Sequence, residues 1–182
     1  MEQTYNWPLG SGFAPGTMLR LRGTIPNGGK VFNINFQTKH DYNTSDIIFH
    51  ISIRANENLV VMNTKDGGKW MTEQLRANEN LVVMNTKDGG KWMTEQRAST
   101  SAIAPGREFE ILIACEQKQF RVSVNGFHLA DFAMRRAHTL ITALSIIGEV
   151  NVGGMSFESS RPVPPKPHPH GGGFGGPFPF PR

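Results

Sequence analysis

Apolar and polar residues alternate along most of the chain with the two-residue period of β-strands. The stretch VFNINFQ (residues 31–37) alternates phenylalanine and isoleucine with asparagine and glutamine. The stretch DIIFHISIR (46–54) places Ile47, Phe49, Ile51 and Ile53 on one face, and His50, Ser52 and Arg54 on the other. This alternation predicts strands with one face in a core and one face toward solvent.

Three further stretches follow the same pattern: REFEILIAC (107–115), QFRVSVNGFHLADF (119–132) and TALSIIGEVNVGGMSFES (142–159). Asn125-Gly126 predicts a two-residue hairpin turn in the second, because both turn positions need a positive φ. Helical signals are confined to FAMRRAH (132–138), which predicts one turn. Short strands separated by Gly, Pro and Asn are typical of an all-β, two-sheet antiparallel β-sandwich.

One segment of 21 residues occurs twice. RANENLVVMNTKDGGKWMTEQ fills positions 54–74 and again 76–96, a period of 22 residues. Each copy predicts one β-hairpin, and the even period preserves which side chains face the core. Repeat architectures usually need three or more diverged units, so we interpret the pair as one extra duplicated β-hairpin within a sandwich.

The chain divides into residues 1–160, the predicted domain, and residues 161–182, a Pro/Gly/His/Phe-rich tail. That tail holds 8 of the 12 prolines and few residues that could build a core, so we expect it to be a disordered tail or linker.

Charge and targeting signals narrow the function classes. The formal net charge is +4, and no run of Lys and Arg appears, so we expect no nucleic-acid partner. We expect no membrane insertion, because no apolar stretch reaches about 20 residues. The start of the chain has no secretory signal, and the single cysteine, Cys115, suits a reducing compartment and a buried thiol. A cytoplasmic location is expected, with export independent of a signal peptide left open.

Catalytic and metal-binding patterns are missing from the sequence, including GxSxG, HExxH, paired cysteines and a P-loop. We therefore expect a non-enzymatic protein with no cofactor and no metal. Polar and aromatic residues instead gather on consecutive predicted strands, as His50, Ser52 and Arg54, then Asn63, then Trp70 and Glu73. Such side chains suit a saccharide, since polar groups bind hydroxyls and an indole packs on a sugar's apolar face.

These stretches resemble the carbohydrate-recognition domain of galectins, whose motif runs H-x-N-x-R, V-x-N and W-G-x-E-x-R. His50 and Arg54 match the first part, and Val61 and Asn63 match the second. The third part is matched twice, by Trp70 and Glu73 and by Trp92, Glu95 and Arg97. The resemblance covers about residues 16–159 and implies a galectin-like jelly roll that recognises β-galactosides on glycoproteins and glycolipids.

The resemblance also implies a role for each matched residue. His50, Arg54 and Asn63 or Asn85 would bind the axial 4-hydroxyl of galactose. Trp70 or Trp92 would stack under the sugar, and Glu73 or Glu95 would accept from the 6-hydroxyl and orient Arg54.

Only one hairpin can occupy the site, and the identical copies leave three arrangements open. The preferred set comprises His50, Ser52, Arg54, Asn85, Trp92, Glu95 and Arg97, because it keeps the E-x-R sequence. The alternative copy supplies Asn63, Trp70 and Glu73, and a mixed form takes Asn63 with Trp92.

The sequence departs from the galectin pattern in three ways. Ser52 stands where the family has Asn, Met71 and Met93 replace the Gly after Trp, and Leu75 replaces the Arg after the first copy. Two functions are therefore kept: a β-galactoside-binding lectin, and a galectin-fold protein-interaction module with lost or altered sugar binding. A homodimer, or a second lectin domain beyond the tail, also stays open.

Overall fold

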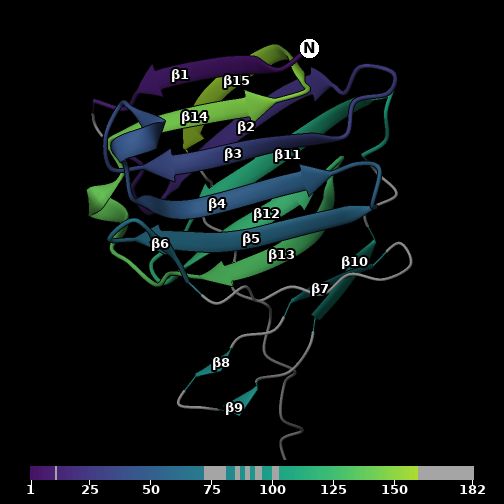
Figure 1. Ribbon diagram of the computed structural model, residues 1–182. Coiled ribbons are helices and arrows are strands. Elements are labelled where there is room, and N and C mark those ends of the chain that lie inside the picture. The colour runs from purple at the N-terminus through teal and green to yellow at the C-terminus, as the bar shows by residue number, and fades with distance from the viewer. Residues whose placement is uncertain are drawn as a thin grey trace, which may run out of the picture.

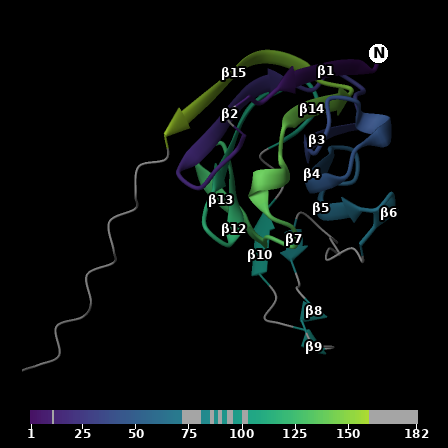
Figure 2. The same cartoon turned by 90° about the vertical axis from the view of Figure 1, so that its left-hand side faces the viewer.

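Two antiparallel sheets lie face to face and enclose the core (Figures 1 and 2). The computed structural model describes residues 1–10, 12–71, 81–84, 87–88, 91–92, 96–99 and 103–159. The six-stranded sheet has the order β1 (Gln3–Pro8), β14 (Ala143–Gly148), β3 (Val31–Gln37), β4 (Ile47–Arg54), β5 (Leu59–Asp66) and β6 (Lys69–Trp70). The five-stranded sheet has the order β13 (Phe127–Ala133), β12 (Gln119–Val124), β11 (Glu108–Cys115), β2 (Thr17–Thr24) and β15 (Asn151–Ser159). The predicted β-sandwich is confirmed.

The described strands of the second copy of the duplicated segment lie outside both main sheets. β7 (Leu81–Met84) pairs with β10 (Gln96–Ser99), and β8 (Lys87–Asp88) pairs with β9 (Lys91–Trp92). In Figure 1, β8 and β9 are drawn well away from the sandwich. The first copy supplies β5 and β6, so the structure places the first hairpin in the sheet.

Aromatic side chains dominate the space between the sheets. Phe49 of β4 stacks on Phe120 of β12, with ring centroids 4.5 Å apart, and Phe13 stacks on Phe36 at the same distance. All four rings are fully buried. Their offset stacking adds to the free energy gained from burying apolar area. Cys115 is buried in the same core, as the sequence predicts.

The predicted turns and strands agree with the observed ones, with two differences. Asn125 and Gly126 have φ of 49° and 83°, which confirms the predicted turn between β12 and β13. The helical turn expected over 132–138 instead appears as a short 3₁₀ helix, η2 (His138–Leu140), because β13 continues to Ala133. A second 3₁₀ helix, η1 (Tyr42–Thr44), precedes β4.

The second difference concerns β3, whose predicted half-buried pattern is incomplete. Asn35 and Gln37 occupy the outer, polar positions of the strand but are fully buried, together with Ser145 of β14. Their polar groups are paired with one another and with the backbone of residues 39–40. Such pairing removes most of the free-energy cost of burying amides.

The predicted tail, residues 161–182, lies outside the described residues. No helix in the described part of the chain is long and apolar enough to cross a membrane.

Candidate functional site

The outer face of the six-stranded sheet carries a shallow groove of about 470 Å³ over β3, β4, β5 and β6. It is lined by Val31, Asn33, His50, Ser52, Arg54, Glu57, Val61, Asn63 and Trp70. A second hollow of about 500 Å³ lies on the other sheet, but two of its three charged side chains, Arg22 and Glu110, are paired with each other, and no Trp, Tyr or His lines it. The groove is therefore the candidate site, since it joins an exposed indole to polar side chains from adjacent strands.

Strand β4 supplies three groove residues at every second position. Phe49, Ile51 and Ile53 are buried in the core. The alternation of a strand consequently turns His50, Ser52 and Arg54 to the outer face. The sequence predicted this division correctly because the pattern is fixed by the period of the strand.

Strand β5 is antiparallel to β4 and brings Asn63 opposite His50, and Val61 opposite Ser52. The Gly67-Gly68 turn returns the chain along β6, where Lys65 pairs with Trp70. Both glycines have positive φ, 56° and 77°, a conformation that side chains other than glycine rarely adopt. This tight turn brings the indole of Trp70 over the groove.

Trp70 and His50 form the aromatic part of the site. Their ring centroids are 4.7 Å apart with planes inclined at 57°, and Trp70 is 46% exposed. Burial, followed by the charge of Arg54, lowers the pKa of His50 from 6.5 to about 4. The imidazole is therefore neutral at physiological pH and offers one N–H donor and one lone-pair acceptor.

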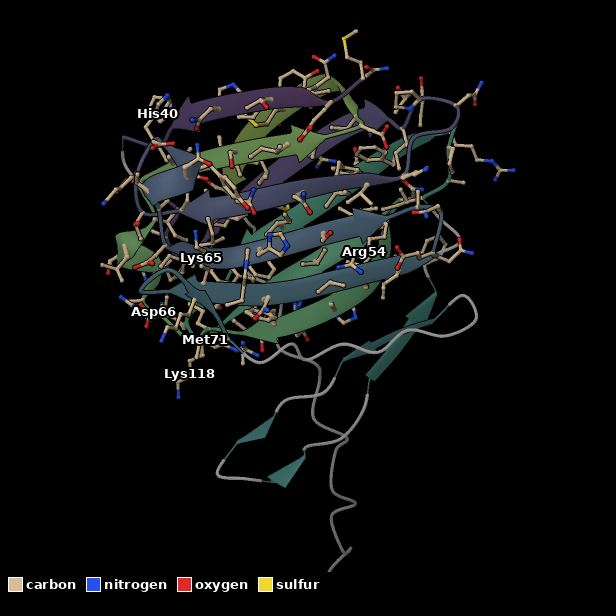
Figure 3. The ribbon with its side chains drawn as sticks, in the orientation of Figure 1. His40, Arg54, Lys65, Asp66, Met71 and Lys118 are labelled. Atoms are coloured by element: carbon tan, nitrogen blue, oxygen red, sulfur yellow. The ribbon has the colours of Figure 1, made fainter. Side chains whose placement is uncertain are left out.

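Arg54 lies at one end of the β4–β5 pair, and Met71 at the other (Figure 3). A guanidinium nitrogen of Arg54 lies 3.6 Å from a carboxylate oxygen of Glu57, in the turn that joins β4 to β5. Both side chains are more than a third exposed, so the pair orients Arg54 more than it stabilises the fold. Sequence reasoning missed Glu57, although its place three residues after Arg54 in a tight turn was a usable signal.

Asn63 is only 3% exposed, and most of its side-chain bonding capacity is used inside the protein. Its Nδ2 donates to the carbonyl of Met71 at 3.1 Å. Its Oδ1 accepts from the backbone N–H of Thr64 at 2.8 Å and from Nη1 of Arg135 at 3.1 Å. An amide has two N–H donors, and among the described residues Asn63 Nδ2 donates to Met71 alone, so one N–H can donate to a ligand.

Arg135 lies in the loop after β13, and its side chain contacts Asn63 although the two residues are remote in sequence. Its guanidinium also lies 5.3 Å from the centre of the Phe132 ring. Burial lowers the pKa of Arg135 from its ordinary value. No local sequence pattern marked Arg135 as a site residue, because its contact with Asn63 spans 72 positions.

Two predicted residues of the preferred set, Trp92 and Arg97, belong to strands outside the six-stranded sheet. Trp92 is in β9 and Arg97 in β10, strands that pair with β8 and β7. Asn85, Glu95 and the first copy's Glu73 lie outside the described residues. The groove unites His50, Ser52 and Arg54 of the preferred set with Asn63 and Trp70 of the alternative copy.

The described residues favour neither a metal site nor a reactive cysteine. Among the described residues there is no group of three or more His, Cys, Asp or Glu side chains that could hold a metal ion. Burial, and then the charge of Glu116, raise the pKa of the Cys115 thiol to about 12, so this cysteine is poorly suited to act as a nucleophile.

The chain matches the family model described as galactoside-binding lectin, in two segments, residues 4–78 and 74–157. The first segment contains the first hairpin copy, and the second contains the other copy. Together the matches extend over the whole sandwich.

Curated relatives include Galectin-4 of Sus scrofa, 29% identical over 149 residues, which cover 81% of this chain and 39% of that protein. Galectin-3 of Cricetulus longicaudatus is 29% identical over 153 residues, covering 81% of this chain and 51% of that protein. The chain thus spans about two fifths of the Galectin-4 relative and half of the Galectin-3 relative.

Solved structures with the same fold include a human galectin-16 variant, with a TM-score of 0.64, 19% identity, and 85% and 94% of the two chains covered. Sheep galectin-11, solved in complex with glycerol, gives a TM-score of 0.62 at 19% identity, with 86% and 98% covered. At this identity the likeness concerns the fold.

Proposed function

Because the chain belongs to the galectin family of galactoside-binding lectins, we propose that it binds β-galactosides through His50, Ser52, Arg54, Asn63 and Trp70. One observation carries this proposal: His50 and Asn63 face each other in one groove with the ring of Trp70 beside them. Galectins are lectins without catalytic activity, and this chain is not an enzyme.

The chemistry of the groove supports a sugar ligand. The exposed indole of Trp70 offers a flat apolar surface for the C–H face of a pyranose. His50, Arg54 and the remaining N–H of Asn63 surround that surface with directional hydrogen-bonding groups. We propose that they bind the axial 4-hydroxyl of galactose, whose absence would leave buried polar groups unpaired.

The affinity for a simple disaccharide should be low. A few hydrogen bonds at about 0.5–1.5 kcal/mol each and one stacking contact, offset by association entropy, correspond to a Kd of about 0.1–1 mM. Strong attachment to glycoproteins or glycolipids would then need several sites on one particle.

This proposal keeps His50, Ser52 and Arg54 of the set that the sequence favoured. Asn63 and Trp70 of the first hairpin copy replace Asn85 and Trp92 of the second. The position of β5 beside β4 supports the change. We keep Glu73 as the acceptor for the 6-hydroxyl on the resemblance alone. Glu57 already orients Arg54 at 3.6 Å, so that part of the role proposed for Glu73 is filled by another carboxylate.

Retention on lactosyl-agarose tests the function. The protein should bind the resin, elute with lactose and stay bound in sucrose. Trp70→Ala should flow through, while Phe127→Ala is a suitable control, because Phe127 is 77% exposed on the other sheet and away from the groove. Passage of the unaltered protein straight through the resin would refute the lectin proposal.

A second function, protein interaction through the same face, is favoured by Met71. This side chain is 40% exposed beside Trp70 at the position where galectins have glycine. Exposed Met and Trp together form an apolar surface suited to a protein partner. If lactosyl-agarose does not retain the protein, a Met71→Gly variant that gains retention would show that this side chain blocks the sugar.

The oligomeric state and the cellular location of the protein are also matters of proposal. We propose either a homodimer or a second lectin domain beyond residue 182, which sedimentation of the purified chain and the extent of the full transcript would distinguish. We also propose a cytoplasmic location with export independent of a signal peptide. Detection of the protein in medium from intact, secretion-blocked cells would test the export.

A further inference from the structure

Next to the groove, a row of hydrogen-bonded polar side chains crosses the outer face of the six-stranded sheet. His50 Nδ1 lies 2.6 Å from Asn35 Oδ1, and Asn35 Nδ2 lies 3.2 Å from Ser145 Oγ. Ser145 Oγ lies 2.7 Å from Gln37 Oε1, and Gln37 Nε2 contacts the carbonyls of Lys39 and His40 at 2.8 and 3.1 Å. We call this row, from His50 to Gln37, the polar relay.

The polar relay is built into the sheet. Asn35 is opposite His50 in the β3–β4 ladder and opposite Ser145 in the β14–β3 ladder. Directly opposite residues share one face of a sheet. Asn35, Gln37 and Ser145 are at most 1% exposed, so water cannot replace a missing partner easily.

The backbone carbonyls at the end of the polar relay fix its direction. A carbonyl oxygen only accepts hydrogen bonds, so the amide nitrogen of Gln37 must face the carbonyls of Lys39 and His40. The oxygen of Gln37 therefore faces Ser145, whose hydroxyl donates to it.

The same reasoning continues from Ser145 to His50. With its proton directed to Gln37, the oxygen of Ser145 accepts from the nitrogen of Asn35. The oxygen of Asn35 then faces His50 Nδ1, and an amide oxygen only accepts. The proton assignment thus follows from the whole network rather than from one ambiguous contact.

We propose that Gln37 and Ser145, which do not line the groove, are positioning residues that hold His50 in the tautomer with its proton on Nδ1. The Nε2 atom of His50 is then a lone-pair acceptor for ligand. The low pKa of His50 supports this, because a neutral ring carries a single N–H.

This tautomer determines which ligand groups fit beside His50. Nε2 needs a hydroxyl that donates, while Arg54 on the same strand can only donate to the oxygen of that hydroxyl. A sugar hydroxyl does both, whereas a fluorine or a methyl ether accepts only. The consequence for sugars rests on the proposed function, but the tautomer itself does not.

The direct test is the tautomer of His50 in the sugar-free, full-length protein at pH 7. Long-range ¹H–¹⁵N correlation spectra distinguish an Nδ1–H from an Nε2–H imidazole, and His50→Gln assigns the signal. We expect Nδ1–H alone. Protonation on Nε2, or a mixture of the two tautomers, would overturn the proposal without any substitution.

Ser145→Ala tests the distant link. It leaves Asn35 free to rotate, so both tautomers should appear, and if they are equally populated the affinity for lactose should fall about twofold. Ser156→Ala is the matched control, because Ser156 lies on β15 of the other sheet and bonds to Glu158. A single unchanged tautomer in folded Ser145→Ala would overturn the role of Ser145.

A second variant tests the proposal in case Ser145→Ala does not fold. Asn35→Asp keeps an acceptor toward Nδ1 and adds a negative charge, so it should preserve the tautomer and raise the pKa of His50. If His50 shows the expected tautomer throughout but lactose never binds, the polar relay stands and the lectin proposal fails.

Discussion

His50 of β4 lies directly opposite Asn63 of β5 in the antiparallel ladder. The sequence favoured Asn85 for this position, because residues 76–96 repeat residues 54–74 letter for letter and the second copy alone keeps the E-x-R sequence. The first copy follows β4 through a short turn, Ala55–Asn58 in sequence, so placing it in the sheet closes a small loop. Placing the second copy there would require 22 more residues in that loop, and loop-closure entropy disfavours this modestly.

Trp70→Ala and Trp92→Ala should therefore behave differently. We expect Trp70→Ala to reduce lactose affinity about 2–10-fold, since an aromatic stacking contact is worth about 0.5–1.5 kcal/mol. Trp92→Ala should change it less than about twofold. An NMR titration with lactose measures both variants, and equal losses would contradict the assignment of the site to the first copy.

Lactose binding should depend on pH through His50. Its pKa is about 4, so affinity should stay constant from about pH 8 to pH 5.5 and fall as the pH approaches 4, where Nε2 gains a proton. Arg54, Asn35, Asn63 and Trp70 surround the ring, and among them only Arg54 is charged. A midpoint near pH 6.5 would contradict this burial effect.

The stability of the fold should fall over the same acid range. The folded-state pKa is lowered from 6.5 to about 4, so the unfolded chain binds more protons between these values. Stability therefore rises with pH in this window, and is lost as pH falls from 6.5 toward 4, by at most about 3 kcal/mol. Urea unfolding at several pH values should give a shallower slope for His50→Gln than for the unaltered protein.

Ser52→Asn should strengthen lactose binding. Ser52 is nearly buried between Asn33 and Val61 on the neighbouring strands, and its hydroxyl is shorter than the amide that galectins carry there. One added hydrogen bond of about 0.5–1.5 kcal/mol corresponds to a gain of about 2–10-fold. Ser52→Ala provides the reference, and a variant Ser52→Asn that binds no better than Ser52→Ala would argue against a direct role for this position.

The two consecutive arginines after β13 should contribute unequally. Arg135→Met removes a charged donor from the buried oxygen of Asn63, at an expected cost of about 1–2 kcal/mol of unfolding free energy. Arg136→Met breaks an ion pair with Asp66, whose side chain is 43% exposed, and should cost less than about 1 kcal/mol. Denaturant midpoints compare the two, and a larger loss for Arg136→Met would reverse the ranking.

Cys115 should resist alkylation in the folded protein. The thiol is buried, and its pKa is raised to about 12, so at pH 8 only about one molecule in ten thousand carries the thiolate that reacts. Iodoacetamide should modify Cys115 rapidly in guanidinium chloride and very slowly without it. Equal rates would show that the core opens readily at this strand.

The sandwich and the face that carries the site follow from the pattern of residues along the chain. Strands have a period of two residues, so the positions of Phe49, Ile51 and Ile53 fix the outward direction of His50, Ser52 and Arg54. The turn at Asn125-Gly126 is equally local, because positive φ is a property of the residues themselves. The galectin resemblance rests on residues in order along the chain, which a sequence displays in full.

The tertiary structure was needed to show which hairpin pairs with β4 and which residues remote in sequence form hydrogen bonds to the site residues. Identical copies have identical local preferences, so the choice between Asn63 and Asn85 depends on strand pairing across the whole sheet. Arg135 reaches Asn63, and Ser145 reaches Asn35, across 72 and 110 positions. Those contacts arise because folding places segments remote in sequence next to each other, within one sheet or at the edge of the sandwich. Polar groups buried there need hydrogen-bond partners.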